Sequence, residues 1–360
     1  MDRNLKTVHW NITTMDRSFI LLFNVLVENY DRLPLELRIS GVLQTIEYLY
    51  YPLLAAVGVP VNLVTIVILS RGKCGLSKCV TRYLVAMAVA DLLVVILDLI
   101  LRHIPVVYWR QFQFVRSLPV CNIHAVLLYA VTDCSVWFTV TFTFDRFVAI
   151  CCQKLKTKYC TKKTAAVVLG TVTVLSGLKN IFWYFMLNRW YLLVNVPWFC
   201  VVSVAVLHSP VWTAIEFLHN ILTPGVPFVL ILLLNTVTVR HILVASRARR
   251  RLRGPSSGER PRDPEMASRK KSIISLFVIS GNFILLWAVF MLYSIYYRMW
   301  WFGYKSVKIP DYVSVLGFML QMLSCCTNTG IYAVTQAKFR VQLKNLAKYP
   351  FTVLVKFIKR

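Results

Sequence analysis

Two side chains of opposite charge, Asp145 and Arg146, stand together in the stretch TVTFTFDRFVAICCQ at residues 139–153, with apolar residues on both sides. A charge at the centre of a bilayer costs about 2.5–3.5 kcal/mol or more. The pair therefore either marks the place where a helix leaves the membrane or works as an ion pair inside a helix bundle. The other polar residues and the elements that carry them decide between these alternatives.

Further polar residues fall inside apolar segments: Asn62, Asp91, Asp98, Asp133, Ser135 and Asn328. Such residues normally face the interior of a helix bundle and have partners there. Asp91 is the carboxylate for which we expect a function, because the oxygen atoms available near it suit a sodium ion or a proton. These oxygens belong to Ser135, Ser324 and Asn328. The alternative is a hydrogen-bond network that is complete without an ion.

The composition indicates a membrane protein. Of the 360 residues, 58% are hydrophobic and 16% are charged, whereas about a quarter are charged in soluble domains. The net charge of +26 also occurs in nucleic-acid-binding proteins, but here the basic residues fall mainly between apolar runs. We therefore expect basic cytoplasmic loops and no nucleic-acid partner. The ten cysteines show no metal-ligand spacing, and we expect no cofactor besides an allosteric sodium ion.

Seven segments are long and apolar enough to cross a bilayer, which takes about 20 residues in a helix. These segments are 45–70, 78–103, 120–152, 162–187, 211–246, 270–298 and 311–333. The sequence therefore predicts an all-α membrane protein, a seven-transmembrane helix bundle over residues 45–333. The shorter apolar run at 191–207 is interrupted by Pro197, and we expect a loop there, with strands in its valine-rich parts.

The charges between these segments predict the orientation of the chain. Lysine and arginine gather after the first, third, fifth and seventh segments, which places the N-terminus outside the plasma membrane and the C-terminus in the cytoplasm. We expect residues 1–44 to be extracellular, without a cleavable signal peptide and with a glycosylation site at Asn11. Residues 247–269 predict a basic, disordered cytoplasmic loop. The tail, 334–360, predicts a short amphipathic eighth helix that binds membrane lipid.

Short motifs occur in successive segments in a fixed order: Asn62 in GVPVNLV, Asp91 in LVAMAVADLL, Cys121, Asp145-Arg146-Phe147, Phe283 and Trp287 in FILLWAV, and Asn328 and Tyr332 in NTGIY. In this order, the chain resembles the rhodopsin-like (class A) G-protein-coupled receptors over nearly its whole length. The stretches SRGKCGLSKCVTRYL and LQMLSCCTNTGIYAVTQAKFR resemble an orphan branch related to receptors that sense aromatic amino acids. The resemblance implies a receptor, not an enzyme, that transmits binding of an extracellular ligand to heterotrimeric G proteins.

The resemblance also implies roles for single residues. Cys121 matches the cysteine that bonds to the second outer loop, where Cys200 is the expected partner. Arg146 matches the switch arginine, which Asp145 holds in the resting state. On activation the inner end of the sixth segment swings out and this arginine faces the G protein. The remaining residues of the switch are Phe283, Trp287, Asn328 and Tyr332.

The chain departs from the family pattern at several positions. Many relatives carry an acid at the base of the sixth segment that clasps the switch arginine, but Arg269 stands there. We therefore expect a less restrained resting state and measurable basal signalling. Val289 and Thr329 replace two family prolines, and Asn235 replaces a tyrosine of the fifth segment. These departures concern the details of switching and not the fold.

The type of ligand is predicted from residues at pocket depth. Receptors for amines carry an acid where this chain has Leu128, which argues against that ligand class. Arg102 can bind a carboxylate, and Asp98 or Glu216 an ammonium group, so we expect an amino acid or a short peptide. Alternatively, Asp98 and Arg102, four residues apart, pair with each other. The expected pocket residues are Asp98, Arg102, Leu128, Tyr129, Thr132, Glu216, His219, Trp287, Phe290, Met291 and Phe318, with His103 and Asp133 also facing the cavity.

Other functions are weighed against this interpretation. A transporter or channel often shows inverted repeats, and the sequence contains no such repeat. A membrane enzyme is unsupported, since no HExxH motif and no clustered Cys/His arrangement occurs. A light sensor needs a lysine within 311–333, and none is present. A non-signalling scavenger or partner subunit remains an alternative, because Arg146 indicates the capacity for coupling and not its use.

Overall fold

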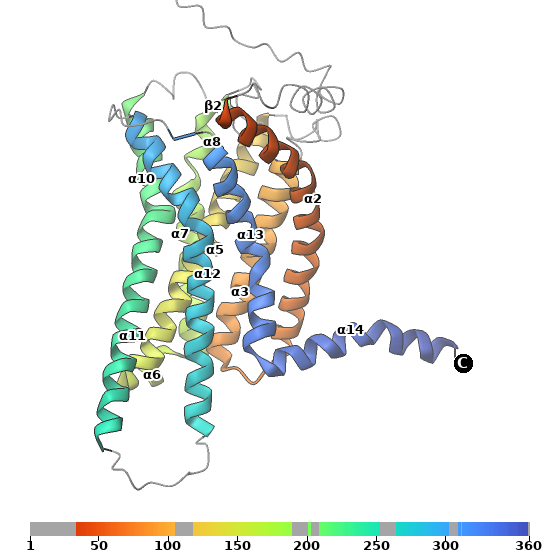
Figure 1. Ribbon diagram of the computed structural model, residues 1–360, viewed down its shortest axis with the longest axis vertical. Helices are drawn as coiled ribbons and strands as arrows, with labels where there is room; N and C mark the ends of the chain where they lie inside the picture. Colours follow the sequence, from red (N-terminus) through yellow and green to blue (C-terminus); the bar gives the residue numbers. More distant parts are fainter. Residues whose placement is uncertain are drawn as a thin grey trace, which may run out of the picture.

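The computed structural model describes residues 34–104, 118–188, 201–202, 209–252, 264–301, 309–310 and 312–358. Long helices run side by side through the molecule, and helix α14 leaves one end of the bundle sideways (Figure 1). We call the half that carries α8 and β2, at the top of Figure 1, the upper half. The half that carries α6 and α14 is the lower half.

The bundle consists of seven helical segments within the described residues. They are α2 (Leu35–Ser70), α3 (Lys78–Val94) continued by the π-helix η3 (Val95–His103), α5 (Leu118–Cys151), α7 (Lys162–Asn180) followed by α8 (Trp183–Met186), α10 (Pro210–Asn220) continued by the π-helix η5 (Ile221–Gly225) and α11 (Val226–Leu252), α12 (Pro264–Trp301), and α13 (Tyr312–Thr335). The shorter elements are α6 (Gln153–Tyr159), α14 (Ala337–Ile358), and strands β1 (Leu187–Asn188) and β2 (Val201–Val202), which pair antiparallel. The predicted all-α, seven-helix fold is confirmed.

Most of these helices meet the requirements of a membrane span. Six described segments are long and apolar enough: Leu35–Ser70, Lys78–His103, Val120–Cys151, Lys162–Phe185, Pro210–Arg247 and Ile273–Tyr297. Helix α13 has 24 residues, which also exceeds the length of about 20 that a crossing requires. Its buried positions include polar residues, namely Gln321, Ser324, Asn328 and Thr329. The seventh helix is therefore less apolar because it contributes polar groups to the interior of the bundle.

The structure modifies one of the connections expected from the sequence. The loop predicted over 247–269 is shorter, because α11 continues to Leu252 and α12 begins at Pro264. Arginine is a good helix former, so the basic run simply extends α11. Residues 253–263 lie outside the described residues. Of the run 191–207, the described part is β2 with the two residues of its strand.

Polar side chains and a glycine determine where the helices of the lower half begin. Ser77 accepts the backbone N–H of Val80 at 3.3 Å and caps the start of α3. Thr161 accepts the N–H of Thr164 at 3.1 Å and caps α7 in the same way. Gly75 lies in the connection between α2 and α3 with φ of 69°, which a residue with a side chain rarely adopts.

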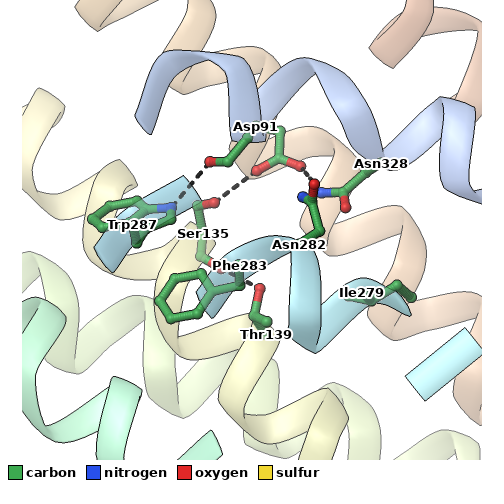
Figure 2. A pocket seen from close by; sticks show the side chains of 9 residues that line it. Asp91, Ser135, Thr139, Ile279, Asn282, Phe283, Trp287 and Asn328 are labelled. Carbon is green, nitrogen blue, oxygen red and sulfur yellow. Dashed lines mark hydrogen bonds between the residues drawn. The ribbon is translucent and has the colours of Figure 1, made fainter. Parts of the chain in front are cut away.

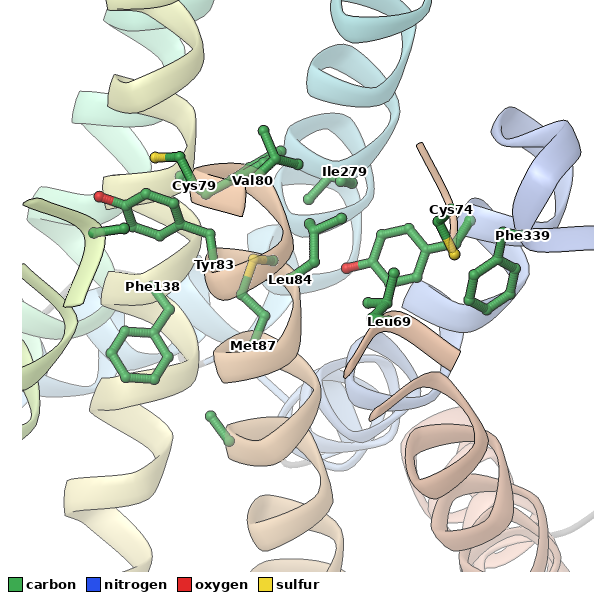
Figure 3. Packing of buried hydrophobic residues seen from close by; sticks show 14 of the residues in the cluster. Leu69, Cys74, Cys79, Val80, Tyr83, Leu84, Met87, Phe138, Ile279 and Phe339 are labelled. Atoms are coloured by element: carbon green, nitrogen blue, oxygen red, sulfur yellow. The ribbon is translucent and has the colours of Figure 1, made fainter. Parts of the chain in front are cut away.

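The largest apolar core lies in the lower half and fixes the start of α14 to the bundle (Figure 3). Phe339 of α14 is completely buried, and its ring centroid lies 5.9 Å from that of Tyr332 in α13. Arg340 Nη1 donates to the carbonyl oxygens of Ala333 and Val334, at 3.1 and 2.8 Å. These carbonyls end α13 and have no partner within the helix, so the guanidinium caps it.

Candidate transmembrane switch and ligand site

The ion pair of Asp145 and Arg146 lies in the lower half of α5. Asp145 is completely buried, and Arg146 donates to its Oδ2 through Nε at 3.0 Å and also through Nη2. The second carboxylate oxygen, Oδ1, accepts a hydrogen bond from Cys79 Sγ of α3 at 3.2 Å. Cys160 Sγ, just after α6, donates to the backbone carbonyl of Asp145 at 3.6 Å. Asp145 therefore holds Arg146, while α3 and the loop after α6 hold Asp145.

The two thiols around Asp145 were not identified from the sequence, since neither belongs to a recognisable spacing. Burial, and secondly the carboxylate of Asp145, raise the pKa of the Cys160 thiol to about 12. The thiol is therefore protonated at neutral pH and available as a hydrogen-bond donor. Arg269, where relatives carry an acid, lies in the first turns of α12, and its side chain is outside the described residues.

Asp91 lies beside a small polar cavity in the middle of the bundle (Figure 2). Its Oδ1 accepts a hydrogen bond from Ser135 Oγ at 2.6 Å, and its Oδ2 accepts one from Asn328 Nδ2 at 2.7 Å. Trp287 Nε1 donates to Ser324 Oγ at 3.0 Å on the same cavity. The structure thus brings together the predicted residues Asp91, Ser135, Ser324, Asn328, Phe283 and Trp287. The cavity is also lined by Thr139, Ile279 and Asn282, which were not predicted from the sequence.

The residues around this cavity have the charge and the oxygen atoms that would bind the sodium ion expected from the sequence. No lysine or arginine lines the cavity, so the carboxylate of Asp91 faces it without a basic partner among the lining residues. Ser135, Thr139 and Ser324 add hydroxyl oxygens, and hard cations prefer such oxygen ligands. Asp91, with hydroxyls from α5 and α13, would hold the ion. A bound ion would supply the positive charge that the buried carboxylate lacks.

Asn62 of α2 and Thr329 of α13 connect these two helices. Asn62 Nδ2 donates to the carbonyl oxygens of Gly58 and Cys325, both at 2.9 Å. Thr329 Oγ1 lies 2.7 Å from Thr65 Oγ1 and also donates to the carbonyl oxygen of Val61 at 3.0 Å. Threonine in place of the family proline therefore adds a contact between helices.

Tyr332 is completely buried in α13, one turn below Asn328. Its hydroxyl has no hydrogen-bond partner among the described residues. The role of Tyr332 in the switch therefore stays a prediction.

In the upper half, Asp98 and Arg102 of η3 pair with each other. Arg102 Nε lies 2.8 Å from Asp98 Oδ1, and His103 Nε2 lies 3.4 Å from the same oxygen. The guanidinium also lies over the ring of Phe318 in α13, with its Cζ 5.2 Å from the centroid. All three polar side chains are buried. The geometry corresponds to the alternative in which these residues pair with each other.

The other expected pocket residues form two aromatic groups. Tyr129 of α5 stacks on Trp183 of α8 with centroids 4.0 Å apart, and His219 of α10 meets both rings edge-on. In the second group, the ring centroid of Phe290 of α12 lies 5.1 Å from that of Phe318 of α13.

The remaining members of the predicted pocket lie on the same helices. Leu128 is buried beside Trp183, and Thr132 is buried one turn further along α5. The ring centroid of Trp287 lies 6.0 Å from that of Phe290, and Met291 is the next residue of α12. Glu216 is on α10, but its side chain is outside the described residues. Trp183 lies within the predicted fourth span, 162–187, but was not among the predicted pocket residues; the structure places it on α8, a separate short helix after α7.

A second ion pair of the upper half joins three helices. Lys179 Nζ of α7 lies 2.6 Å from Asp133 Oδ2 of α5 and donates to Thr223 Oγ1 of η5 at 3.1 Å. Asn180 Nδ2 donates to the same carboxylate oxygen at 2.6 Å. Asp133 is thus placed among polar partners from α7, and Lys179 was not identified from the sequence.

The expected disulfide and glycosylation site fall largely outside the described residues. Cys121, at the upper end of α5, is disulfide-bonded and buried. Cys200 and Asn11 lie outside the described residues, so their roles stay predictions.

Comparison with known proteins points to one family. The family model described as 7 transmembrane receptor (rhodopsin family) matches residues 61–332. The chain is also similar to the mouse protein named Probable G-protein coupled receptor 142, with 24% identity over 321 residues. That alignment covers 86% of this chain and 74% of the mouse protein.

Proposed function

The chain belongs to the rhodopsin family of seven-transmembrane receptors, and from this premise we propose that it transmits binding of an extracellular ligand to heterotrimeric G proteins. The observation that carries this proposal is the Asp145–Arg146 pair in the lower half of α5. A basic residue that is held by a buried acid can exist in a held and a released state, and a partner that binds the released state shifts the equilibrium. The family is a receptor family, and we propose no enzymatic activity.

The proposed ligand is a small molecule such as an amino acid, or a short peptide, bound in the upper half. Two aromatic groups around Tyr129 and Phe318 offer apolar surface, and small-molecule sites combine such surface with a few polar groups. The ion pair of Asp98 and Arg102 supports a ligand with charged ends. A carboxylate would compete with Asp98 for the guanidinium, and an ammonium group would compete with Arg102 for the acid.

This function requires the upper half to face outward. We propose that the protein lies in the plasma membrane with its N-terminus outside, Asn11 glycosylated, and Cys121 bonded to Cys200. In this orientation the basic ends of α11 and α14 lie in the cytoplasm, as the positive-inside rule requires. The first turns of α14, which are fixed to the bundle by Phe339, would then rest on anionic lipid.

A sodium ion at Asp91 is the proposed allosteric ligand. Trp287 and Asn328 reach the same cavity from α12 and α13, so an ion there would favour the arrangement of helices that forms the cavity. Adding sodium chloride in place of N-methylglucamine chloride should lower basal output. Asp91→Asn should remove this dependence, and a variant with unchanged sodium dependence would contradict the site.

Basal signalling is proposed because Arg269 replaces the acid that clasps the switch arginine in many relatives. Basal second-messenger output at confirmed surface expression should exceed that of mock-transfected cells. Output equal to that of mock-transfected cells would contradict a less restrained resting state.

The experiment that tests the receptor function is a panel of G-protein dissociation assays, one for each G-protein family, in cells that carry the receptor at their surface. We expect signal in at least one assay, either basal or after addition of an amino-acid or peptide library. Arg146→Ala should abolish it at equal surface expression. Arg82→Ala is a matched control, since the side chain of Arg82 donates to the carbonyl of Lys162 and is not part of the Asp145–Arg146 pair. No signal with any G protein would favour a non-signalling partner subunit.

A further inference from the structure

Helix α12 contacts α13 and α11 very unequally. It packs along α13 over much of its length and touches α11 at few places. Asn282 donates to Thr327 of α13 at 2.9 Å, and Trp287 donates to Ser324 at 3.0 Å. The ion pairs at Asp98, Asp133 and Asp145 involve no residue of α12. Among the side chains that the structure describes, the attachment of α12 to α11 therefore comes from uncharged contacts.

One such contact is a hydrogen bond from Asn235 of α11 to Ser280 of α12. Asn235 Nδ2 donates to Ser280 Oγ at 2.8 Å, and Ser280 is completely buried. The hydroxyl proton of Ser280 is directed to the carbonyl oxygen of Leu276 in its own helix, at 2.7 Å. The oxygen is thereby oriented as an acceptor, and the amide of Asn235 meets it from the neighbouring helix.

The position of this bond relates it to the switch. Ser280 precedes Phe283 and Trp287 by one and two helical turns. Next to it, Ile231 of α11 and Phe283 share an apolar cluster with Val140 of α5. A movement of the lower end of α12 away from α5 changes the distance between Asn235 and Ser280 and breaks the bond, because an N–H···O hydrogen bond requires a donor–acceptor distance of about 2.7–3.2 Å.

We propose that Asn235 and Ser280 are positioning residues that hold α12 against α11 in the resting state of this receptor. The inference rests on the proposed signalling function and identifies the restraint that acts on α12. The restraint is uncharged, so it is weaker than an ion pair between buried groups. Separation of the bond accompanies the displacement of α12 that opens the lower face of the bundle toward Arg146.

The test compares Asn235→Ala, Ser280→Ala and the double variant with the wild type. A fluorinated phenylalanine at Ile274, an exposed position near the lower end of α12, reports the displaced fraction of this helix by fluorine NMR. Basal G-protein dissociation is measured in parallel at equal surface expression. Thr236→Ala is the matched control, because Thr236 is the exposed neighbour of Asn235 and donates only within α11, to Leu232 at 2.8 Å.

We expect each single variant to raise the displaced fraction and the basal output roughly five-fold, as loss of one neutral hydrogen bond predicts. The double variant should exceed neither single variant, since both substitutions remove the same bond. Single variants that match Thr236→Ala, or a double variant whose effect equals the product of the two single effects, would overturn the proposal. Asn235 is partly exposed, so Asn235→Ala decides the matter if Ser280→Ala fails to fold.

The two readouts separate this proposal from the proposed function. If no variant and no wild-type sample activates any G protein, the signalling function fails. A rise in the displaced fraction would still support the bond between α11 and α12, and an unchanged displaced fraction would contradict it.

Discussion

The upper and lower halves of the bundle join their helices by different polar contacts. In the upper half, the ion pair of Asp133 and Lys179 joins α5 to α7, and Lys179 also binds η5 through Thr223. In the lower half, the charged pair of Asp145 and Arg146 lies within α5 alone. Helices α11 and α12 are joined there by a hydrogen bond between two neutral groups, Asn235 and Ser280.

This difference indicates where the molecule changes shape most easily. Removing one partner of a buried ion pair costs about 3–5 kcal/mol, whereas a neutral hydrogen bond contributes about 0.5–1.5 kcal/mol. Helices α11 and α12 can therefore separate at modest cost, while α5, α7 and η5 stay together. A receptor that opens at its lower face needs helix contacts that cost less free energy to break there than in the upper half.

The largest effect is expected for Lys179→Met. The substitution leaves the carboxylate of Asp133, which is 1% exposed, without its cation. We expect a loss of about 3 kcal/mol, at the lower end of the range for buried pairs because the Lys179 side chain is 23% exposed. The apparent melting temperature of the detergent-purified protein, followed by tryptophan fluorescence, measures it.

Two variants control for the loss of the lysine itself. Lys163→Met removes an exposed lysine of the same helix and should leave the melting temperature unchanged. Combining Lys179→Met with Asp133→Asn removes both charges and should recover most of the loss. A double variant as unstable as Lys179→Met would contradict the argument from an unpaired buried charge.

A smaller effect is expected for Thr329→Val in the lower half. The side chain keeps its shape and loses its hydroxyl, which bonds to Thr65 and to the carbonyl of Val61 in α2. We expect a loss of about 1–2 kcal/mol, less than for Lys179→Met. Thr173→Val is the matched control, since its exposed hydroxyl donates to Leu169 of the same helix. A melting temperature below that of Lys179→Met would reverse the comparison between the two halves.

The fold could be predicted from the sequence because apolar length alone defines most of the membrane spans. Residues 78–103 were predicted as one span, and the structure has one continuous helical segment from Lys78 to His103. The end of α11 was placed too early because the basic run after it looks like a loop in composition, although arginine favours helix. Amino-acid composition therefore predicts the end of a membrane span better than the end of a helix.

The site was predictable where partners are close in sequence or fixed by a family motif. Asp98 and Arg102 are four residues apart on one helix, so their pairing could be anticipated. Asp133 and Lys179 lie on different helices, and their contact depends on how α5 and α7 are rotated toward each other. Cys79 was missed for the same reason, because nothing near it in the sequence indicates that α3 meets Asp145.

A third prediction concerns Cys79, whose thiol is a weak donor to Asp145. Cys79→Ser places a stronger donor at the carboxylate and should lower basal output about two-fold, while Cys79→Ala should raise it by a similar factor. G-protein dissociation at matched surface expression measures both. Cys152→Ser changes a cysteine outside this contact and should have no effect. Equal output from the serine and alanine variants would show that the bond to Asp145 does not restrain the switch.

The smallest effect concerns the second thiol beside Asp145. Because burial and the Asp145 carboxylate raise the pKa of Cys160 to about 12, its thiolate fraction should rise about ten-fold per pH unit from pH 7 to pH 10, without levelling near pH 9. Iodoacetamide labelling, quantified by mass spectrometry of the peptide that contains Cys160, measures this rate. Asp145→Asn removes the second cause and leaves burial, so labelling at pH 8 should be faster but still slower than in the denatured chain. A rate that levels off near pH 9 would mean that Cys160 is not held against Asp145, and that the lower half restrains its acid through α3 alone.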